Sequence, residues 1–512
     1  MADRMANKLI LLFLAGVCAL APALCAREPA ARPNVLLICV DDLRPLAGTY
    51  GDPLAQTPNL DRLAARGARF DAAYCNQAVC APSRYNLMLG TRSTSSGLYH
   101  FGRQMRDVYP DAVTLSQHFI SHGYRAESIG KIYHFGHNTH GDDASWSVPH
   151  TKDLVIEYLD PASKPDGALT REEAFFNNAD TGRPNRELPR GAAWEMPDVS
   201  DAAYADGRTA REAVRRLEAA KARKNPFFLA VGFARPHLPF SAPKKYWDLY
   251  DRSRFEISAD THLPKGAPAY AGKKLGELDQ YVPVPEAPPL SEELQRALIH
   301  GYYASTSYMD AQLGIVLDAL DALELAENTT VVLWGDHGYA LGTHGEWTKH
   351  SNYEIVNRIP LLFAGPGVKP GLATRALAET VDIYPTLAAL AGLPVPTGPQ
   401  PIDGTNLAPV LNGSAATVKD HVYHAYPRLR PGKGEWLGRA IRTERYRLVE
   451  WLPVNGAPAE PDLELYDYEV DPDERVNVAA ERPAIVAELQ KILARHPAPK
   501  VPARPSARKN AS

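Results

Sequence analysis

The 512-residue chain has little cysteine, little net charge and only one long hydrophobic run. Five cysteines cannot supply a disulfide-rich scaffold, and a formal net charge of −4 gives no reason to expect nucleic acid as a partner. Beyond the N-terminus, no apolar run approaches the length of a membrane span, so we expect no stable membrane insertion. We find no internal repeats.

Hydrophobic residues make up 45% of the chain, enough for a substantial core. The 44 prolines and 36 glycines indicate many loops rather than a helical bundle. The length fits one large domain and a smaller one.

The N-terminus resembles a targeting segment. Arg4 and Lys8 precede an apolar run at residues 9–24, and small residues follow near Ala26. This order predicts a signal peptide over residues 1–26 and export to the periplasm or the medium. The Ala-, Arg- and Pro-rich composition is typical of a bacterial source.

Removal of that segment would leave Cys39, Cys75 and Cys80 in the chain. This is an odd number for an exported protein. If Cys80 is chemically modified, Cys39 and Cys75 either pair or stay buried as thiols, and the sequence leaves both possibilities open.

Three apolar runs, at residues 34–40, 227–233 and 330–334, are typical of central strands that are covered on both faces. Residues 359–363 predict a further strand. Helical patterns cover residues 58–66, 206–224 and 382–390, and residues 291–325 predict two helical segments. We therefore expect an α/β fold, in which a large domain contains a mostly parallel mixed central sheet flanked by helices.

The character of the chain changes near residue 419. Short alternating segments predict four antiparallel strands, and residues 479–494 predict a closing helix. We assign residues 33–415 to the large domain and residues 419–495 to a smaller C-terminal α+β subdomain. The Pro-rich, basic tail at residues 496–512 predicts disorder.

Acidic residues follow two of the predicted central strands. Asp41 and Asp42 come directly after the first strand, and Asp336 follows residues 330–334 after Gly335. Carboxyl ends of parallel strands meet at one edge of the sheet, where ligands bind. Carboxylates brought so close repel unless a cation lies between them. An oxygen-rich set with one imidazole, His337, suits Ca²⁺, with Mg²⁺ as the alternative, better than Zn²⁺.

A set of cationic residues could complete a pocket for a tetrahedral oxyanion ester. Each residue taken alone is more often a solvated surface charge. The set comprises Arg84, Lys131, His134, His237 and Lys349.

The most informative motif is Cys80-Ala81-Pro82-Ser83-Arg84. Pro, Ser and Arg fall at these offsets from a given Cys with a chance on the order of 10⁻⁴. The alternative interpretation is a buried structural thiol beside a turn. The Pro82 turn predicts the start of a helix whose amide groups point at an anion.

This Cys-x-Pro-Ser-Arg motif resembles the signature of the type I sulfatases of the alkaline phosphatase superfamily. The other acidic and cationic positions named above match the subgroup similar to iduronate-2-sulfatase. The matching stretches include Asp41-Asp42, Gly130-Lys131 through His134, Pro236-His237, and Asp336-His337-Gly338 through Lys349. The resemblance covers nearly the whole chain after residue 26, and it makes residues 33–415 a catalytic sulfatase domain.

The resemblance implies that Cys80 is oxidised to formylglycine by a formylglycine-generating or sulfatase-maturating enzyme. It also implies one divalent cation, held by Asp41, Asp42, the modified Cys80, Asp336 and His337. The hydrated aldehyde would attack the sulfur of a sulfated saccharide, with Arg84 close by.

The resemblance further implies roles for the remaining groups. Asp336 would accept the proton of the attacking hydroxyl, and His237 and Lys349 would bind sulfate and protonate the leaving alcohol. His134, oriented with Lys131, would take the proton from the second hydroxyl. The leaving-group pocket would be lined by residues 99–101, 138–205 and 346–347.

Two other functions remain open from the sequence. The first is hydrolysis of phosphate or phosphonate monoesters by a relative with the same nucleophile. A two-zinc site of the alkaline phosphatase type would need additional His and Asp ligands, and we identify no surplus set. The second is a non-catalytic glycan-binding relative, which would usually lack one of the charged groups.

We predict that the active protein carries formylglycine at position 80, because the recognition pentapeptide is intact. Protein co-expressed with a formylglycine-generating system should show the aldehyde in place of the thiol by peptide mass spectrometry. Full activity in protein that carries only unmodified Cys80 would contradict this prediction.

Overall fold

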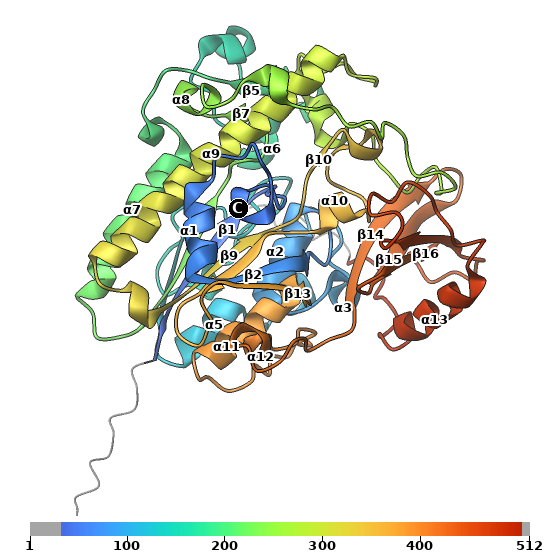
Figure 1. Ribbon diagram of the computed structural model, residues 1–512. Helices are drawn as coiled ribbons and strands as arrows, with labels where there is room; N and C mark the ends of the chain where they lie inside the picture. The colour runs from blue at the N-terminus through green and yellow to red at the C-terminus, as the bar shows by residue number, and fades with distance from the viewer. Residues whose placement is uncertain (1–31, 504–512) are drawn as a thin grey trace, which may run out of the picture. The chain divides into compact units, whose positions relative to one another are not determined.

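The computed structural model describes residues 32–503, so the predicted signal peptide lies outside the described residues. A seven-stranded sheet forms the centre of the fold (Figure 1). Its order is β13 (Leu372–Glu379), β2 (Gly67–Tyr74), β12 (Leu361–Ala364), β9 (Thr329–Gly335), β1 (Asn34–Val40), β6 (Phe227–Phe233) and β3 (Arg125–Gly130).

The central strands β1, β6 and β9 are buried along their whole length. β1 pairs in parallel with β6 on one side and with β9 on the other. β12 pairs antiparallel with both of its neighbours, β9 and β2. A mostly parallel mixed sheet is the predicted α/β class, which the structure confirms.

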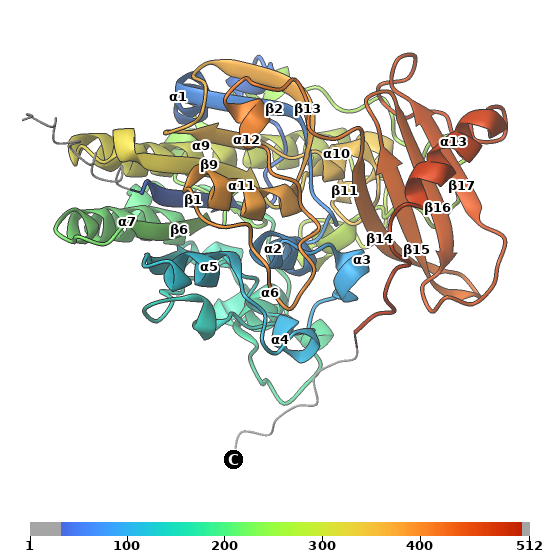
Figure 2. The ribbon, with the colours of Figure 1, turned by 90° about the horizontal axis from the view of Figure 1, so that it is seen from below.

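Side chains of β1 alternate between two cores. Val35 and Leu37 pack in the core that includes α2 (Cys80–Leu89), α5 (Leu115–Ser121) and α11 (Ile383–Leu390). Leu36 and Ile38 pack in the core that includes α1 (Pro58–Arg66), α7 (Ala205–Lys221) and α9 (Glu292–Ala322). Helices therefore cover both faces of the sheet, as Figure 2 shows, which explains why β1 is apolar from Val35 to Val40.

The prediction of two helical segments in residues 291–325 is wrong. The structure has one 31-residue helix, α9, which begins after Ser291 and ends at Ala322. Gly301 lies inside this helix, and a Cβ added there would come within 2.9 Å of Phe240 and Trp247. Tertiary packing thus selects glycine at this position rather than a local turn.

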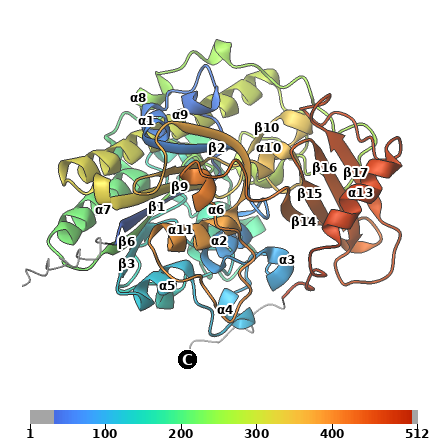
Figure 3. The same cartoon turned by 60° about the horizontal axis from the view of Figure 1, so that its bottom comes forward.

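The C-terminal part contains a separate four-stranded antiparallel sheet, as predicted (Figures 2 and 3). Its strands are β14 (Val422–Arg430), β15 (Gly434–Arg442), β16 (Tyr446–Pro453) and β17 (Asp462–Asp467), and α13 (Pro483–Leu493) packs on it. β14 is the strand beside the larger part, since the amide of Ala425 donates to the carbonyl of Asn76 at 3.0 Å.

The remaining helices and strands are short. The helices are α3 (Ser93–Ser96), α4 (Met105–Val108), α6 (Arg171–Asn177), α8 (Lys244–Trp247), α10 (Glu354–Asn357) and α12 (Ala408–Leu411). The two-residue strands are β4 (Gly191–Ala192), β5 (Trp194–Glu195), β7 (Phe240–Ser241), β8 (Tyr281–Val282), β10 (Ala340–Leu341) and β11 (Trp347–Thr348). Within residues 32–503, no helix has both the length and the apolar character that a membrane span requires.

Residues 496–503, the first part of the tail that we predicted to be disordered, belong to the described structure. The amides of Lys500 and Ala503 donate to the carbonyls of Thr94 and Gly97, beside α3. Residues 504–512 lie outside the described residues. Cys39 and Cys75 are both buried free thiols, so the structure has no disulfide between them.

A buried arginine joins the small sheet to the rest of the protein. Arg447, on β16, has a fully buried side chain that pairs with Glu474 and donates to the carbonyl of Asn352. Glu474 in turn accepts from the amide of Glu354, in α10.

We predict that Arg447→Ala lowers the free energy of unfolding by about 3–5 kcal/mol, because it leaves the Glu474 carboxylate buried without its partner. Urea denaturation followed by circular dichroism measures the change. Arg495→Ala is the control in the same subdomain, since the side chains of Arg495 and its partner Asp420 are 62% and 69% exposed, and it should leave stability nearly unchanged. Equal effects of the two variants would show that the buried pair is not a stabilising link.

Candidate active site

The carboxyl ends of β1 and β9 bring four predicted site residues together. Asp41 and Asp42 follow β1, and Asp336 and His337 follow β9; all four side chains are fully buried. The amide of Asp42 donates to Oδ1 of Asp336 at 3.0 Å. The hydroxyl of Tyr302, on α9, donates to the carbonyl of Asp42 at 2.7 Å and so fixes this turn. The expected convergence of these acids is therefore found.

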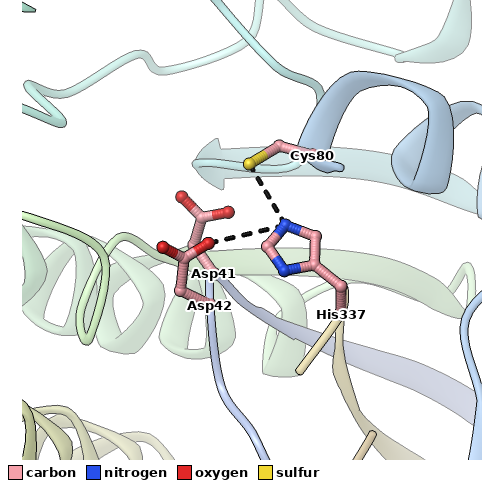
Figure 4. Close-up of side chains that lie close together, drawn as sticks. All are labelled: Asp41, Asp42, Cys80 and His337. Atoms are coloured by element: carbon pink, nitrogen blue, oxygen red, sulfur yellow. Dashed lines mark hydrogen bonds and ion pairs between the residues drawn. The ribbon is translucent and has the colours of Figure 1, made fainter. Parts of the chain in front are cut away.

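Cys80 is the first residue of α2, and its side chain faces the acids (Figure 4). Its Sγ lies 3.3 Å from Nε2 of His337, and the same nitrogen lies 3.4 Å from Oδ1 of Asp42. Ser83 donates to the carbonyl of Asp336 at 2.5 Å. The predicted turn at Pro82 is thus the first turn of a helix, and the N-terminal residue of that helix, Cys80, lies at the site.

Arg84, on α2, binds the acids at the carboxyl ends of β1 and β9. Its Nη2 lies 3.0 Å from Asp41 and 2.9 Å from Asp336. Its Nη1 donates to the carbonyls of Lys131 and Ile132. The whole guanidinium is buried, so it serves as a structural cation inside the site.

The two lysines bind different acids. Lys131 pairs with Asp41, whereas Lys349 pairs with Asp42, at 2.8 Å from its Oδ1. Lys131 follows β3, and its backbone passes close to Gly232. A Cβ added at position 232 would come within 2.3 Å of the Lys131 backbone. Glycine is therefore required at position 232 for this approach.

Lys349 lies on a strained loop. Its neighbours Thr348 and His350 have φ angles of 73° and 92°. A β-branched residue with positive φ is an outlier, and such strain persists where the surroundings impose it, often at functional sites.

His237 follows β6, in a turn held by α7. The amides of Ala234 and Arg235 donate to Asp206 at 2.8 Å each, and the Arg235 side chain donates to the carbonyl of His237 at 3.0 Å. Nδ1 of His237 is bonded to the carbonyl of Leu238, so Nε2 faces the site.

His134 lies in an aromatic pocket rather than among the acids. Its ring packs 4.7 Å from Phe101 and 5.3 Å from Phe176, measured between centroids. Nε2 lies 3.2 Å from Nδ1 of His137, and the buried Nδ1 has no hydrogen-bond partner among the described residues. Lys131 connects this pocket to the acids, because its Nζ lies 4.9 Å from the Phe176 ring.

Sequence reasoning missed Glu277, which lies in a 3₁₀ turn, Gly276–Gln280. Its Oε1 lies 2.7 Å from Nζ of Lys349 and 3.6 Å from Nε2 of His237. The surrounding Pro-rich segment has no periodic pattern, so no sequence signal separates Glu277 from an ordinary loop acid.

Burial and neighbouring charge perturb most of these groups. Burial raises the pKa of Asp336 to about 7, with Asp41 adding to the effect and Arg84 opposing it. Burial opposes ionisation of Asp41 as well, yet Lys131 and Arg84 hold its pKa well below the usual range. Burial raises the pKa of the Cys80 thiol and lowers the pKa of His237. The cations of the site therefore stabilise the ionised forms of its acids unequally: the pKa of Asp41 is lowered, whereas the pKa of Asp336 is raised.

The donor set fits a divalent cation. One ligand atom from each of Asp41, Asp42, Cys80 and His337 lies within 4.8 Å of the others, and Asp336 lies beside this group. Carboxylate oxygens with a single imidazole are the donors that Ca²⁺ and Mg²⁺ accept. The thiol is the one soft member, and its replacement by an oxygen-bearing formylglycine would make the set almost wholly oxygen.

The sequence matches the family model described as Sulfatase over residues 33–393, and the model described as N-sulphoglucosamine sulphohydrolase, C-terminal, over residues 342–498. The iduronate 2-sulfatase of Homo sapiens is 34% identical over 491 residues, which cover 82% of this chain and 85% of the human protein.

Two solved structures have similar folds. A putative sulfatase from Bacteroides thetaiotaomicron aligns with a TM-score of 0.67 and 25% identity, over 91% of this chain and 92% of the other. A phosphonate monoester hydrolase of Agrobacterium radiobacter aligns with a TM-score of 0.68 and 22% identity, over 91% and 95%. The second likeness, at this identity, concerns the fold alone.

We predict that Asp41→Asn loses bound metal and activity together, with activity falling at least about 100-fold, because the variant removes a charged ligand. Elemental analysis of purified protein gives the metal content. Asp318→Asn, at a side chain that is 67% exposed, is the control and should change neither quantity. Two tightly bound zinc ions per chain would instead support the phosphatase alternative.

Proposed function

Because the chain belongs to the sulfatase family, within the alkaline phosphatase superfamily, and is a sulfuric ester hydrolase, we propose that it releases sulfate from a sulfated sugar. The proposed nucleophile is a formylglycine hydrate derived from Cys80, assisted by one divalent cation. The observation that carries the proposal is the buried contact of Cys80 with His337, between acids on one side and cations on the other. The name of the human relative supports a sulfated sugar as substrate.

The cation would be held by Asp41, Asp42, Asp336 and His337, together with position 80, and when bound it supplies positive charge that stabilises the sulfate oxygens. Formylglycine, when present, supplies a nucleophilic oxygen and a second ionisable hydroxyl. Arg84 keeps Asp41 and Asp336 in place. Asp336 is the proposed proton acceptor, because its Oδ1 lies 3.6 Å from the His337 nitrogen that contacts Cys80.

His237 and Lys349 are proposed to bind the sulfate and to protonate the leaving oxygen. Both face Glu277, and Nε2 of His237 also lies 4.0 Å from Asp41. His134 is proposed to take the proton of the second hydroxyl, since its Nδ1 has no partner among the described residues. Position 80 needs both hydroxyls for turnover, because a serine or an unmodified cysteine has only one proton to lose.

Phosphate or phosphonate ester hydrolysis remains the second candidate, and one observation bears on it directly. Asp42, His237 and Glu277 form a further group of possible metal ligands, which the sequence did not reveal. The ammonium of Lys349 already lies 2.8 Å from Asp42 and 2.7 Å from Glu277. Because this cation already pairs with two of the three groups, a second metal ion there is unfavourable. This arrangement favours a single-metal sulfatase.

A non-catalytic glycan-binding role is less well supported, since every charged group that the chemistry requires is present. For maturation, we propose that a formylglycine-generating or sulfatase-maturating enzyme acts on Cys80. For location, we propose export to the periplasm or the medium, on the basis of residues 1–26.

We predict that His237→Ala discriminates between leaving groups. General acid catalysis contributes about 10²–10⁴-fold, so activity on a sulfated sugar should fall by that order, with a much smaller loss on an activated aryl sulfate. A phenolate departs readily without a proton, whereas a sugar alkoxide does not. Steady-state kinetics on both substrates measures the difference.

His262→Ala is the control for this experiment, because His262 is exposed, and it should leave both rates unchanged. Equal losses on the two substrates in His237→Ala, with metal content intact, would show that His237 binds sulfate without protonating the leaving group.

A further inference from the structure

His134, the proposed base, is hydrogen-bonded by a single side chain. Its Nε2 lies 3.2 Å from Nδ1 of His137, and no other residue within the described range 32–503 bonds to the ring. Nδ1 of His134 has no partner in that range, and the residue is only 1% exposed. His137 belongs neither to the acids nor to the cations of the site, so its place beside the base needs an explanation.

Two aromatic rings fix the His137 ring. It stacks on Phe101 at 4.8 Å and on Phe175, in α6, at 4.9 Å between centroids. The interplanar angles are 25° and 13°, so both rings lie nearly parallel to the imidazole. Stacking on two rings restricts the imidazole to one orientation, and this orientation points Nδ1 at His134.

The backbone at His137 is strained. Its φ angle is 52°, and its amide donates to the carbonyl of Phe175 at 2.9 Å. Gly136 and Thr139 close the turn around it, because the amide of each donates to the carbonyl of the other. Glycine would adopt this backbone with less strain, so the turn alone does not require histidine. The side chain is therefore the part of His137 that calls for a role.

The contact constrains where the proton of His134 lies. A neutral imidazole has one N–H and one nitrogen that accepts. Because Nε2 of His134 faces His137, Nδ1 is the nitrogen left to accept a proton from a substrate or intermediate. It can accept only while the His134 proton lies on Nε2, and that N–H must then donate to Nδ1 of His137. Burial lowers the pKa of His137 to about 4, with Glu277 opposing the effect and Lys131 adding to it, so His137 is neutral near pH 7 and able to accept.

We propose that His137 is a positioning residue that holds His134 in the tautomer with its proton on Nε2, and so leaves Nδ1 free as the base. This inference rests on the proposed function, in which His134 takes a proton. When Nδ1 of His134 gains that proton, the Nε2–H bond to His137 becomes charge-assisted and stabilises the imidazolium. His137 itself gains and loses no proton. A base oriented by a third group is a recurring arrangement in covalent catalysis.

Nuclear magnetic resonance tests the tautomer without any need for activity. In purified protein with an unmodified Cys80 and ¹⁵N-labelled histidine, the His134 signals, assigned with His134→Ala, should show a protonated Nε2 and an unprotonated Nδ1. In His137→Phe, which keeps an aromatic ring but lacks the acceptor, the proton should be shared between the two nitrogens. His262→Phe, at an exposed histidine, is the control and should leave the His134 signals unchanged. A proton on Nδ1 in the unsubstituted protein, or signals that His137→Phe leaves unchanged, would overturn the proposal.

Kinetics of the matured protein test the consequence. His137→Phe should lower kcat for sulfate release about 10- to 100-fold and leave KM nearly unchanged, because it removes support from the base and no contact with the substrate. His137→Asn places an amide oxygen where Nδ1 stood, and asparagine tolerates a positive φ, so this variant should recover most of the loss. Equal losses in the two variants would show that His137 only fills space, which overturns the proposal.

The two experiments also separate this inference from the proposed function. If the matured protein releases no sulfate from sulfated sugars while the His134 proton lies on Nε2 and depends on His137, the positioning of His134 stands and the proposed function fails. If sulfate is released and His137→Phe changes neither kcat nor the His134 signals, the proposed function stands and the role of His137 is wrong.

Discussion

The structure depends on how buried charge is balanced at the carboxyl edge of the central sheet. Asp41, Asp42 and Asp336 are all fully buried, and no fold tolerates three such carboxylates without nearby positive charge. Arg84 and the two lysines supply it in the described structure. A divalent cation is the further charge for which the same carboxylates are suited.

This balance explains why the site is assembled from distant parts of the chain. Arg84 can reach both Asp41 and Asp336 only because β1 and β9 are neighbours, although nearly 300 residues separate their ends (the Asp42–Asp336 contact spans 294 positions). Lys349 reaches Asp42 from a strained loop. These side chains are all buried away from water, which strengthens every charge interaction among them.

Strand β14 connects the small sheet to the part of the protein that carries the catalytic residues. This strand begins beside the large sheet, where the amide of Ala425 donates to the carbonyl of Asn76, and its Tyr426 ring lies 6.1 Å from the ring of His350. The small sheet is thereby tied to the catalytic part, because its strand β14 contacts both Asn76 and His350. Arg447 fixes that sheet to the segment at Asn352, directly after the loop that carries Lys349.

Local patterns in the sequence determined the strands β1, β6 and β9 and the short helix α1, because continuous apolar runs and a Thr-Pro start have few alternative structures. They also indicated Cys80, the strand-end acids and the cations, since these residue types follow predicted strands or lie in a recognisable motif. Only the tertiary structure decided that Lys131 neutralises Asp41 while Lys349 neutralises Asp42, and that Glu277 joins them. The tertiary structure also explains the glycine at position 301 inside α9, because Phe240 and Trp247 leave no room for a side chain there. Such contacts join segments that are remote in the chain, and no local pattern records which segments will meet.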